Sequence, residues 1–292
     1  MSINKLYISA LILMAIAPLS SAAKVPYHSE AAQTKAVIFA PGVVSTDAFE
    51  INTVFNKTGD KVLFARCTND FKRCTMMESK FENDQWQIPK ALPFSGGYLE
   101  ADPYYNEDYS AIYFVSKRPI DEGGKETKNV NLWRAELTNG KWQSPEYLAH
   151  LSSKENDLYP SITSNGDLYY PSFRNNERKM YLAKKNGDSF DAPVALPTDM
   201  FGDNAKIGDS VVLPDGNTII FSMRRADSLG KGDLYISKKI NGKWTLAKSL
   251  GEKVNTKDHE FTPIVSPDGN YLFFTRIENG VGNLYQIALT AL

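Results

Sequence analysis

The sequence lacks the features that would point to nucleic-acid binding or to a known type of active site. Lys and Arg total 33 against 34 Asp and Glu, so the formal net charge is −1. Without a basic excess to neutralise a phosphate backbone, we expect no nucleic-acid partner. The three histidines, His28, His150 and His259, lie in unrelated contexts. No zinc-protease, nucleophile-elbow, phosphate-loop or dinucleotide motif occurs, so we predict no catalytic residue, metal or cofactor.

Long apolar runs are also scarce, and the one that stands out lies at the N-terminus. Lys5 precedes a strongly apolar stretch over residues 6–19, and Ser21-Ala22-Ala23 supplies small residues for cleavage. This pattern predicts a signal peptide over residues 1–23, cleaved after Ala23, and a periplasmic or secreted protein. The alternative is an uncleaved anchor, but a spanning helix needs roughly 20 apolar residues. We expect no membrane span in the mature chain.

Cysteine is nearly absent, since Cys67 and Cys74 are the only two. They flank a short loop, and in an exported protein this arrangement favours a disulfide that closes a hairpin. A redox or metal-binding pair is the alternative. Six intervening residues match neither the Cys-x-x-Cys redox motif nor zinc-ligand spacing.

What the sequence does contain is one pattern repeated five times. Each copy has an acidic residue, a short apolar run, a turn, a second apolar run and an arginine. The turns contain Gly59-Asp60, Glu107-Asp108, Asn165-Gly166, Asp215-Gly216 and Asp268-Gly269, of which three are Asn-Gly or Asp-Gly pairs that favour tight hairpins. The acidic residues are Glu50, Glu100, Asp157, Asp209 and Glu260, and the arginines are Arg66, Arg118, Arg174, Arg224 and Arg276.

Further signals within each copy predict a third and a fourth strand. Pairs such as Leu234-Tyr235 mark the third strand, and an aromatic residue followed six positions later by leucine, such as Trp244 and Leu250, marks the fourth. The acidic residues recur at intervals of 50, 57, 52 and 51 residues. Four-stranded units at this spacing are typical of β-propeller blades. The sequence therefore predicts an all-β propeller of five antiparallel, four-stranded blades.

The last copy stops after its third strand, near Ile287. A strand predicted over residues 35–40 can supply the missing one, because it precedes Glu50 by the distance that separates Leu250 from Glu260. The N-terminal strand would then close the ring and remove open sheet edges. We expect residues 24–34 to be a flexible lead and residues 35–292 to form a single propeller domain.

Several motifs resemble the TolB-like, WD-repeat-like propeller family. They are the Ser-Pro-Asp-Gly turn at 266–269, Gly232-Asp233-Leu234-Tyr235, and the stretch from Leu250-Gly251 through Val254-Asn255 to Glu260. The resemblance extends over nearly all of the mature chain. It implies an exported propeller of a kind commonly used for protein or ligand binding, although some relatives are enzymes. Many members have six blades, which is the alternative to the five counted here.

The topology places the acidic residue and the arginine of each repeat at the same end of the first hairpin. We expect five carboxylate–guanidinium pairs that tie the inner strands together. A ring of charge that binds a cation or polar ligand at the channel mouth is the alternative use of the same ten residues. The longer loops, including 119–131 and 225–232, lie at this end too, so we predict the acidic/Arg face to be the working face. Tyr104, Tyr105 and Tyr159 could line it, although core packing is the favoured role for each.

The sequence thus predicts a monomeric, non-enzymatic binding module with a protein or glycan partner. The alternative is a hydrolase or lyase acting on an extracellular carbohydrate or peptide. A catalytic carboxylate pair is defined by distance and should depart from the repeat, as Asp102 and Asp203 do. Surface solubility explains those two residues equally well.

Overall fold

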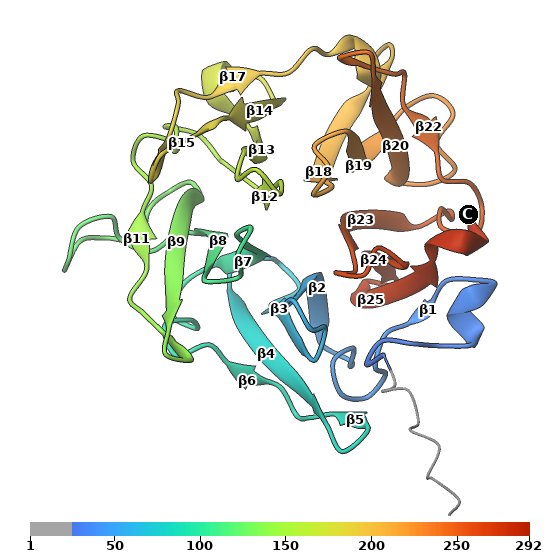
Figure 1. Cartoon of the computed structure of the whole chain (residues 1–292), viewed down its shortest axis with the longest axis horizontal. Coiled ribbons are helices and arrows are strands. Elements are labelled where there is room, and N and C mark those ends of the chain that lie inside the picture. Colours follow the sequence, from blue (N-terminus) through green and yellow to red (C-terminus); the bar gives the residue numbers. More distant parts are fainter. Residues whose placement is uncertain (1–24) are drawn as a thin grey trace, which may run out of the picture.

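The computed structural model describes residues 25–292, which form antiparallel sheets arranged around a central axis (Figure 1). The predicted signal peptide and its cleavage site fall outside the described residues. The sheets are the blades of a five-bladed β-propeller, which confirms the predicted fold class and blade number.

Each blade places its first strand next to the axis and its later strands progressively further out. Blade 1 contains β2 (Phe49–Phe55), β3 (Lys61–Cys67), β4 (Cys74–Glu82), β5 (Gln85–Trp86) and β6 (Lys90–Ala91). Blade 2 contains β7 (Glu100–Tyr105), β8 (Ala111–Ser116), β9 (Asn131–Thr138), β10 (Lys141–Trp142) and β11 (Glu146–Tyr147). Blade 3 contains β12 (Ser161–Ile162), β13 (Leu168–Ser172), β14 (Lys179–Ala183) and β17 (Val194–Ala195), with a separate hairpin of β15 (Lys185–Asn186) and β16 (Ser189–Phe190).

The last two blades follow the same plan. Blade 4 contains β18 (Lys206–Val212), β19 (Thr218–Arg224), β20 (Asp233–Ile240), β21 (Lys243–Trp244) and β22 (Lys248–Ser249). Blade 5 contains β23 (His259–Val265), β24 (Tyr271–Glu278) and β25 (Val281–Ala288). Aromatic side chains such as Phe114, Phe221 and Phe274 are almost completely buried between blades and hold neighbouring sheets together.

The N-terminal strand closes the ring as predicted. In blade 5 the strand order is β1-β25-β24-β23, and β1 (Val37–Ile38) pairs antiparallel with β25. The amide of Phe39 also donates to the carbonyl of Leu284 at 2.8 Å. The strand is shorter than the predicted span of residues 35–40.

Two residues of the segment expected to be a flexible lead, Tyr27 and Ala32, are buried where blades 5 and 1 meet. Tyr27 is only 4% exposed, and its ring lies 5.1 Å from that of Phe55 and 5.9 Å from that of Phe273. A short 3-10 turn, η1 (Ala31–Gln33), buries Ala32. Tyr27 thus supplies the apolar surface that packs this part of the segment against the blades.

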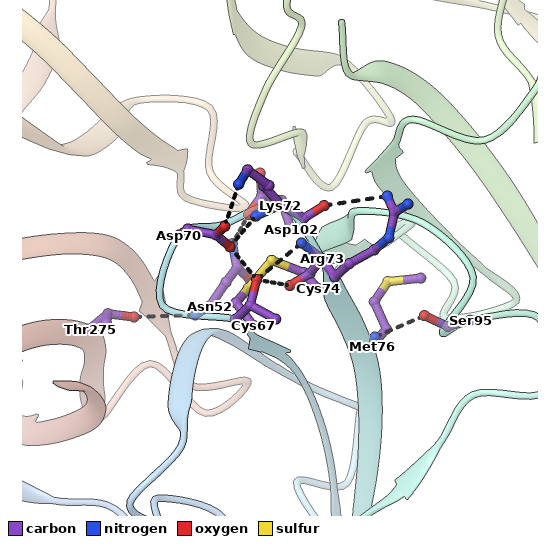
Figure 2. The surroundings of a disulfide bond; sticks show 11 residues. Asn52, Cys67, Asp70, Lys72, Arg73, Cys74, Met76, Ser95, Asp102 and Thr275 are labelled. Carbon is purple, nitrogen blue, oxygen red and sulfur yellow. Dashed lines mark hydrogen bonds and ion pairs between the residues drawn. A yellow bond between two sulfur atoms is a disulfide. The ribbon is translucent and has the colours of Figure 1, made fainter. Parts of the chain in front are cut away.

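The two cysteines form the predicted disulfide (Figure 2). Cys67 ends β3 and Cys74 begins β4, and they are direct partners in the antiparallel register. The loop between them carries Phe71, whose ring lies 4.7 Å from that of Phe49 at the start of the blade's inner strand. The disulfide therefore fixes a loop on the acidic/Arg face.

Candidate functional site

Four of the five predicted carboxylate–arginine pairs are present. Glu50, Glu100, Asp157 and Glu260 are each 0% exposed. The pairs are Arg66 Nε with Glu50 Oε1 at 2.9 Å, Arg276 Nε with Glu260 Oε1 at 2.7 Å, Arg174 Nη2 with Asp157 Oδ1 at 3.4 Å, and Arg118 with Glu100.

The same carboxylates also receive hydrogen bonds from the chain just before them. Glu260, for example, accepts from the Thr256 amide at 3.1 Å and from the Thr256 hydroxyl at 2.7 Å. Its partner Arg276 donates to the Val254 carbonyl at 2.7 Å and stacks over the ring of Tyr285 at 4.4 Å. A buried ion pair is stabilising only when its remaining hydrogen-bonding capacity is met in this way. This geometry favours the structural interpretation of the pairs.

The fifth pair is not formed, and the prediction for blade 4 was wrong. Asp209 contacts Arg178 Nη2 at 3.4 Å through Oδ1, whereas Arg224 is exposed and lies opposite Lys206 in the sheet register. Glu260 lies nine residues before Gly269 of its turn, but the residue nine before Gly216 is Ile207. Counting back from the turn would have shown that Asp209 occupies a different position of the repeat.

That different position defines a second set of residues, here called the axial ring. Its members stand seven residues before the positive-φ residue of each turn, one in each blade: Asn52, Asp102, Tyr159, Asp209 and Thr262. All except Asp209 have positive φ themselves, between 43° and 57°. In blades 1, 2, 4 and 5 the register of the inner hairpin shifts here, as at a β-bulge. A bulge redirects the side chain that it carries.

The axial ring is joined by hydrogen bonds that pass through all five blades. Asp102 accepts from Asn52 Nδ2 at 3.3 Å and from the Tyr159 amide at 3.4 Å. The Asn52 amide donates to Thr275 Oγ1 at 3.2 Å, and the Thr275 and Thr262 hydroxyls lie 2.6 Å apart. The Thr262 amide donates to Asp209 Oδ2 at 3.2 Å. Arg178, from the connection between β13 and β14 of blade 3, donates to Asp209 Oδ1 at 3.4 Å.

Two carboxyl groups are thus held in the interior of the ring. Asp102 is 3% exposed and Asp209 5% exposed. Burial, reinforced by the nearby Asp209, raises the pKa of Asp102 well above its usual value. Burial also raises the pKa of Asp209, to about 6, although Arg178 opposes the shift. Both environments therefore shift the carboxyl groups toward the protonated form.

Some polar atoms near the ring have no hydrogen-bond partner among the described residues. They include Asn52 Oδ1, Thr53 Oγ1 and Arg178 Nε, all of which are buried. Unpaired buried polar atoms are uncommon in proteins and cost free energy. Three of these atoms therefore lie in or next to the axial ring with their hydrogen-bonding capacity unmet.

A funnel of about 340 Å³ opens beside the axial ring, on the side where the inner hairpins turn. Its wall includes Tyr104, Tyr105 and Tyr109 of blade 2, Val54, Val211 and Ile264 of the other inner strands, and Pro214 and Pro267 of the turns. Glu107 is the one charged lining residue, and it pairs with Lys185. The funnel lies on the face opposite the predicted working face. Tyr159, which was expected to line a mouth or pack in the core, belongs to the axial ring instead.

His28 contacts one carboxylate, that of Glu30, at 2.8 Å. Within residues 25–292, no group of three or more His, Cys, Asp or Glu side chains is placed to hold a metal ion. His259 stacks on Phe261 at 4.8 Å, and burial lowers its pKa. No helix in this part of the chain is long and apolar enough to cross a membrane.

No protein-family model matches the chain, and no curated protein matches it in sequence. Its fold is similar to that of a thermostable family-43 glycoside hydrolase, at 12% identity, covering 83% of this chain and 89% of that one, with a TM-score of 0.55. TolB from Acinetobacter baumannii is similar at 11% identity over 82% of this chain, with a TM-score of 0.49. The chain spans about half (54%) of the length of that TolB. At these identities the likeness concerns the fold alone.

Proposed function

We propose that the protein is an exported, monomeric binding propeller, and that an uncharged apolar segment of a partner protein inserts into the funnel. The composition of the funnel wall is the observation that carries this proposal. Its only charged lining residue, Glu107, is already paired with Lys185, so a charged ligand would find no free opposite charge. Tyrosine, valine, isoleucine and proline side chains suit apolar or aromatic side chains of a peptide.

The disulfide supports export. Disulfides form and persist in oxidising compartments and are rare in the cytosol. Cys67 and Cys74 are paired, and the structure describes no free cysteine. This agrees with the expected signal peptide over residues 1–23 and with a periplasmic or secreted location. The motifs that resemble TolB-like propellers point to the same class of exported binding module.

The proposal is tested by obstructing the funnel without disturbing the core. Ser164 is an exposed lining residue, so Ser164→Trp would fill the mouth, while Lys125→Trp adds the same bulk to an exposed loop on the opposite face. The probe is a set of fluorescent, uncharged ten-residue peptides rich in Leu, Phe and Trp. We expect S164W to weaken binding at least tenfold and K125W to leave it unchanged. Equal binding by both variants, or binding only to a parallel oligosaccharide set, would refute the proposal.

A hydrolase or lyase is the second candidate, and the axial ring is the observation in its favour. Asp102 and Asp209 are two carboxyl groups with different surroundings, which is how acid and base roles are separated in glycoside hydrolysis. Against it, both are buried and neither lines the funnel. Incubation with chromogenic glycosides and peptide substrates tests this candidate. Turnover that is lost in Asp209→Asn would support catalysis over simple binding.

A further inference from the structure

Asp102 is a buried carboxyl group whose hydrogen bonds come only from neutral donors. These are the side-chain amide of Asn52 and the backbone amide of Tyr159. The nearest other carboxyl group, Asp209, has the same charge when ionised and would repel it. Arg178, a cation of this region, donates its hydrogen bond to Asp209 at 3.4 Å, and its charge only partly offsets the effect of burial on the pKa of Asp102. An ionised Asp102 would therefore be a buried charge without a direct counter-ion, which is a costly arrangement.

We propose that the axial ring is a proton-binding site, in which Asp102 is held as a neutral carboxylic acid in the folded protein at neutral pH. A protonated Asp102 gains a donor and loses its repulsion from Asp209. Loss of the proton places a second negative charge at the point where the blades meet. The axial ring then holds the blades together more strongly when Asp102 is protonated than when it is ionised.

The position of Asp102 gives this proton a structural consequence. Its carboxyl group joins Asn52 of blade 1 to the Tyr159 backbone of blade 3, on either side of its own blade. The groups facing the pair of carboxyls are Arg178 and Tyr159, which can carry charge, and Asn52, Thr262 and Thr275, which are neutral. One cation among them can balance one ionised carboxylate. The second carboxyl group is therefore the one that must stay neutral.

The direction of the pH dependence follows from linkage. A carboxyl pKa raised by folding means that the folded chain binds more protons than the unfolded chain above about pH 4. The stabilisation of the folded state by these protonated carboxyl groups is fully present at acidic pH. It is lost as pH rises through the pKa that each group has in the folded protein. For Asp209 that loss runs from about pH 4, the ordinary carboxyl pKa, to the raised pKa of about 6. The raised pKa of Asp102 adds a loss in the same direction.

The test compares thermal unfolding of the full mature chain between pH 4 and pH 9 for the wild type, Asp102→Asn and Asp203→Asn. Asparagine keeps the shape of Asp102 without a charge, and Asp203 is an exposed control. We expect the wild type and D203N to lose stability alike as pH rises, whereas D102N should show a smaller loss and a higher Tm at pH 8. Identical pH profiles for the wild type and D102N would overturn the proposal.

A second measurement does not depend on a variant that folds. Infrared spectra of the wild type with ¹³C-labelled aspartate should contain a protonated carboxyl band at pH 7 that fades only at alkaline pH. Absence of that band at pH 7 would overturn the proposal. So would a rise in the wild-type Tm on adding Ca²⁺ at pH 7 that D102N does not share, because a metal ion would then neutralise the site.

Discussion

Glu260 illustrates how one side chain can tie an inner hairpin to the connection that leads into its blade. It has no exposed surface, and Arg276 and Thr256 together supply three hydrogen bonds to it. Removing one partner of such a pair leaves the other buried and uncompensated, which costs about 3–5 kcal/mol. Glu260→Ala should therefore lower the free energy of unfolding by roughly that amount.

Chemical denaturation with urea measures this effect. Arg224→Ala is the matched control, because Arg224 is the arginine of the repeat that is exposed and lies opposite Lys206. A surface change of this kind should alter stability by less than about 0.5 kcal/mol. Similar losses in E260A and R224A would contradict the distinction between paired and unpaired positions.

At this scale the sequence predicts the ion pairs well and the axial ring hardly at all. Glu50 and Arg66 could be paired because the acid recurs nine residues before the turn residue and the arginine seven to nine residues after it. Asn52, Tyr159 and Thr262, in contrast, share no side-chain chemistry. What unites them is a left-handed backbone seven residues before the turn residue, which their side-chain types do not indicate. Asp209 was misassigned for a different reason: it was the acid nearest to the repeat position that Ile207 holds, and counting back from Gly216 separates the two.

The β3–β4 hairpin is the element that the disulfide stabilises. The disulfide joins residues seven apart and so closes only a short loop. By lowering the conformational entropy of the unfolded chain, it should stabilise the folded protein by about 2 kcal/mol. Replacing both cysteines by serine should lower stability by about that amount while keeping the blade count. Urea unfolding of the oxidised wild type, the reduced wild type and C67S/C74S tests this. A reduced wild type that unfolds like the oxidised form would contradict it.

Strand order could be predicted from the repeat, but the extent of some strands could not. The predicted strand over residues 35–40 is regular only at Val37–Ile38, and the inner strand of blade 3 only at Ser161–Ile162. In blade 3, Pro160 follows the positive-φ residue Tyr159 and cannot donate a ladder hydrogen bond. Local sequence therefore limits the regular pairing even where the overall path of the chain follows the repeat.

Ring closure is a property of the whole molecule. A chain that starts at residue 41 lacks β1 and Phe39, a residue 2% exposed whose ring lies 5.2 Å from that of Phe273. We expect this variant to leave the β25 edge open, to self-associate and to unfold less cooperatively. A chain that starts at residue 25 should remain monomeric. Size-exclusion chromatography distinguishes the two, and a peptide of residues 25–40 added in trans should restore monomeric elution.

A monomeric, cooperatively unfolding variant from residue 41 would show that closure by β1 is dispensable. The overall architecture was predictable because five repeats give the blade number directly. The face that carries the funnel was not, because its volume depends on how inner side chains such as Tyr104 and Val211 fill the axis. Loop length indicated the opposite face.

The pairing of β1 with β25 also sets an order of events for a newly made chain. The two partners lie near opposite ends of the sequence, so the first strand to emerge during synthesis must wait for the last. Blades 1 to 4 can form one after another from local hairpins, yet the molecule stays an open crescent with two unpaired margins until residues 281–288 arrive. The ring can therefore close only after β25 has been synthesised. Until then, a chaperone acting on this protein would find exposed surface at the two unpaired edges.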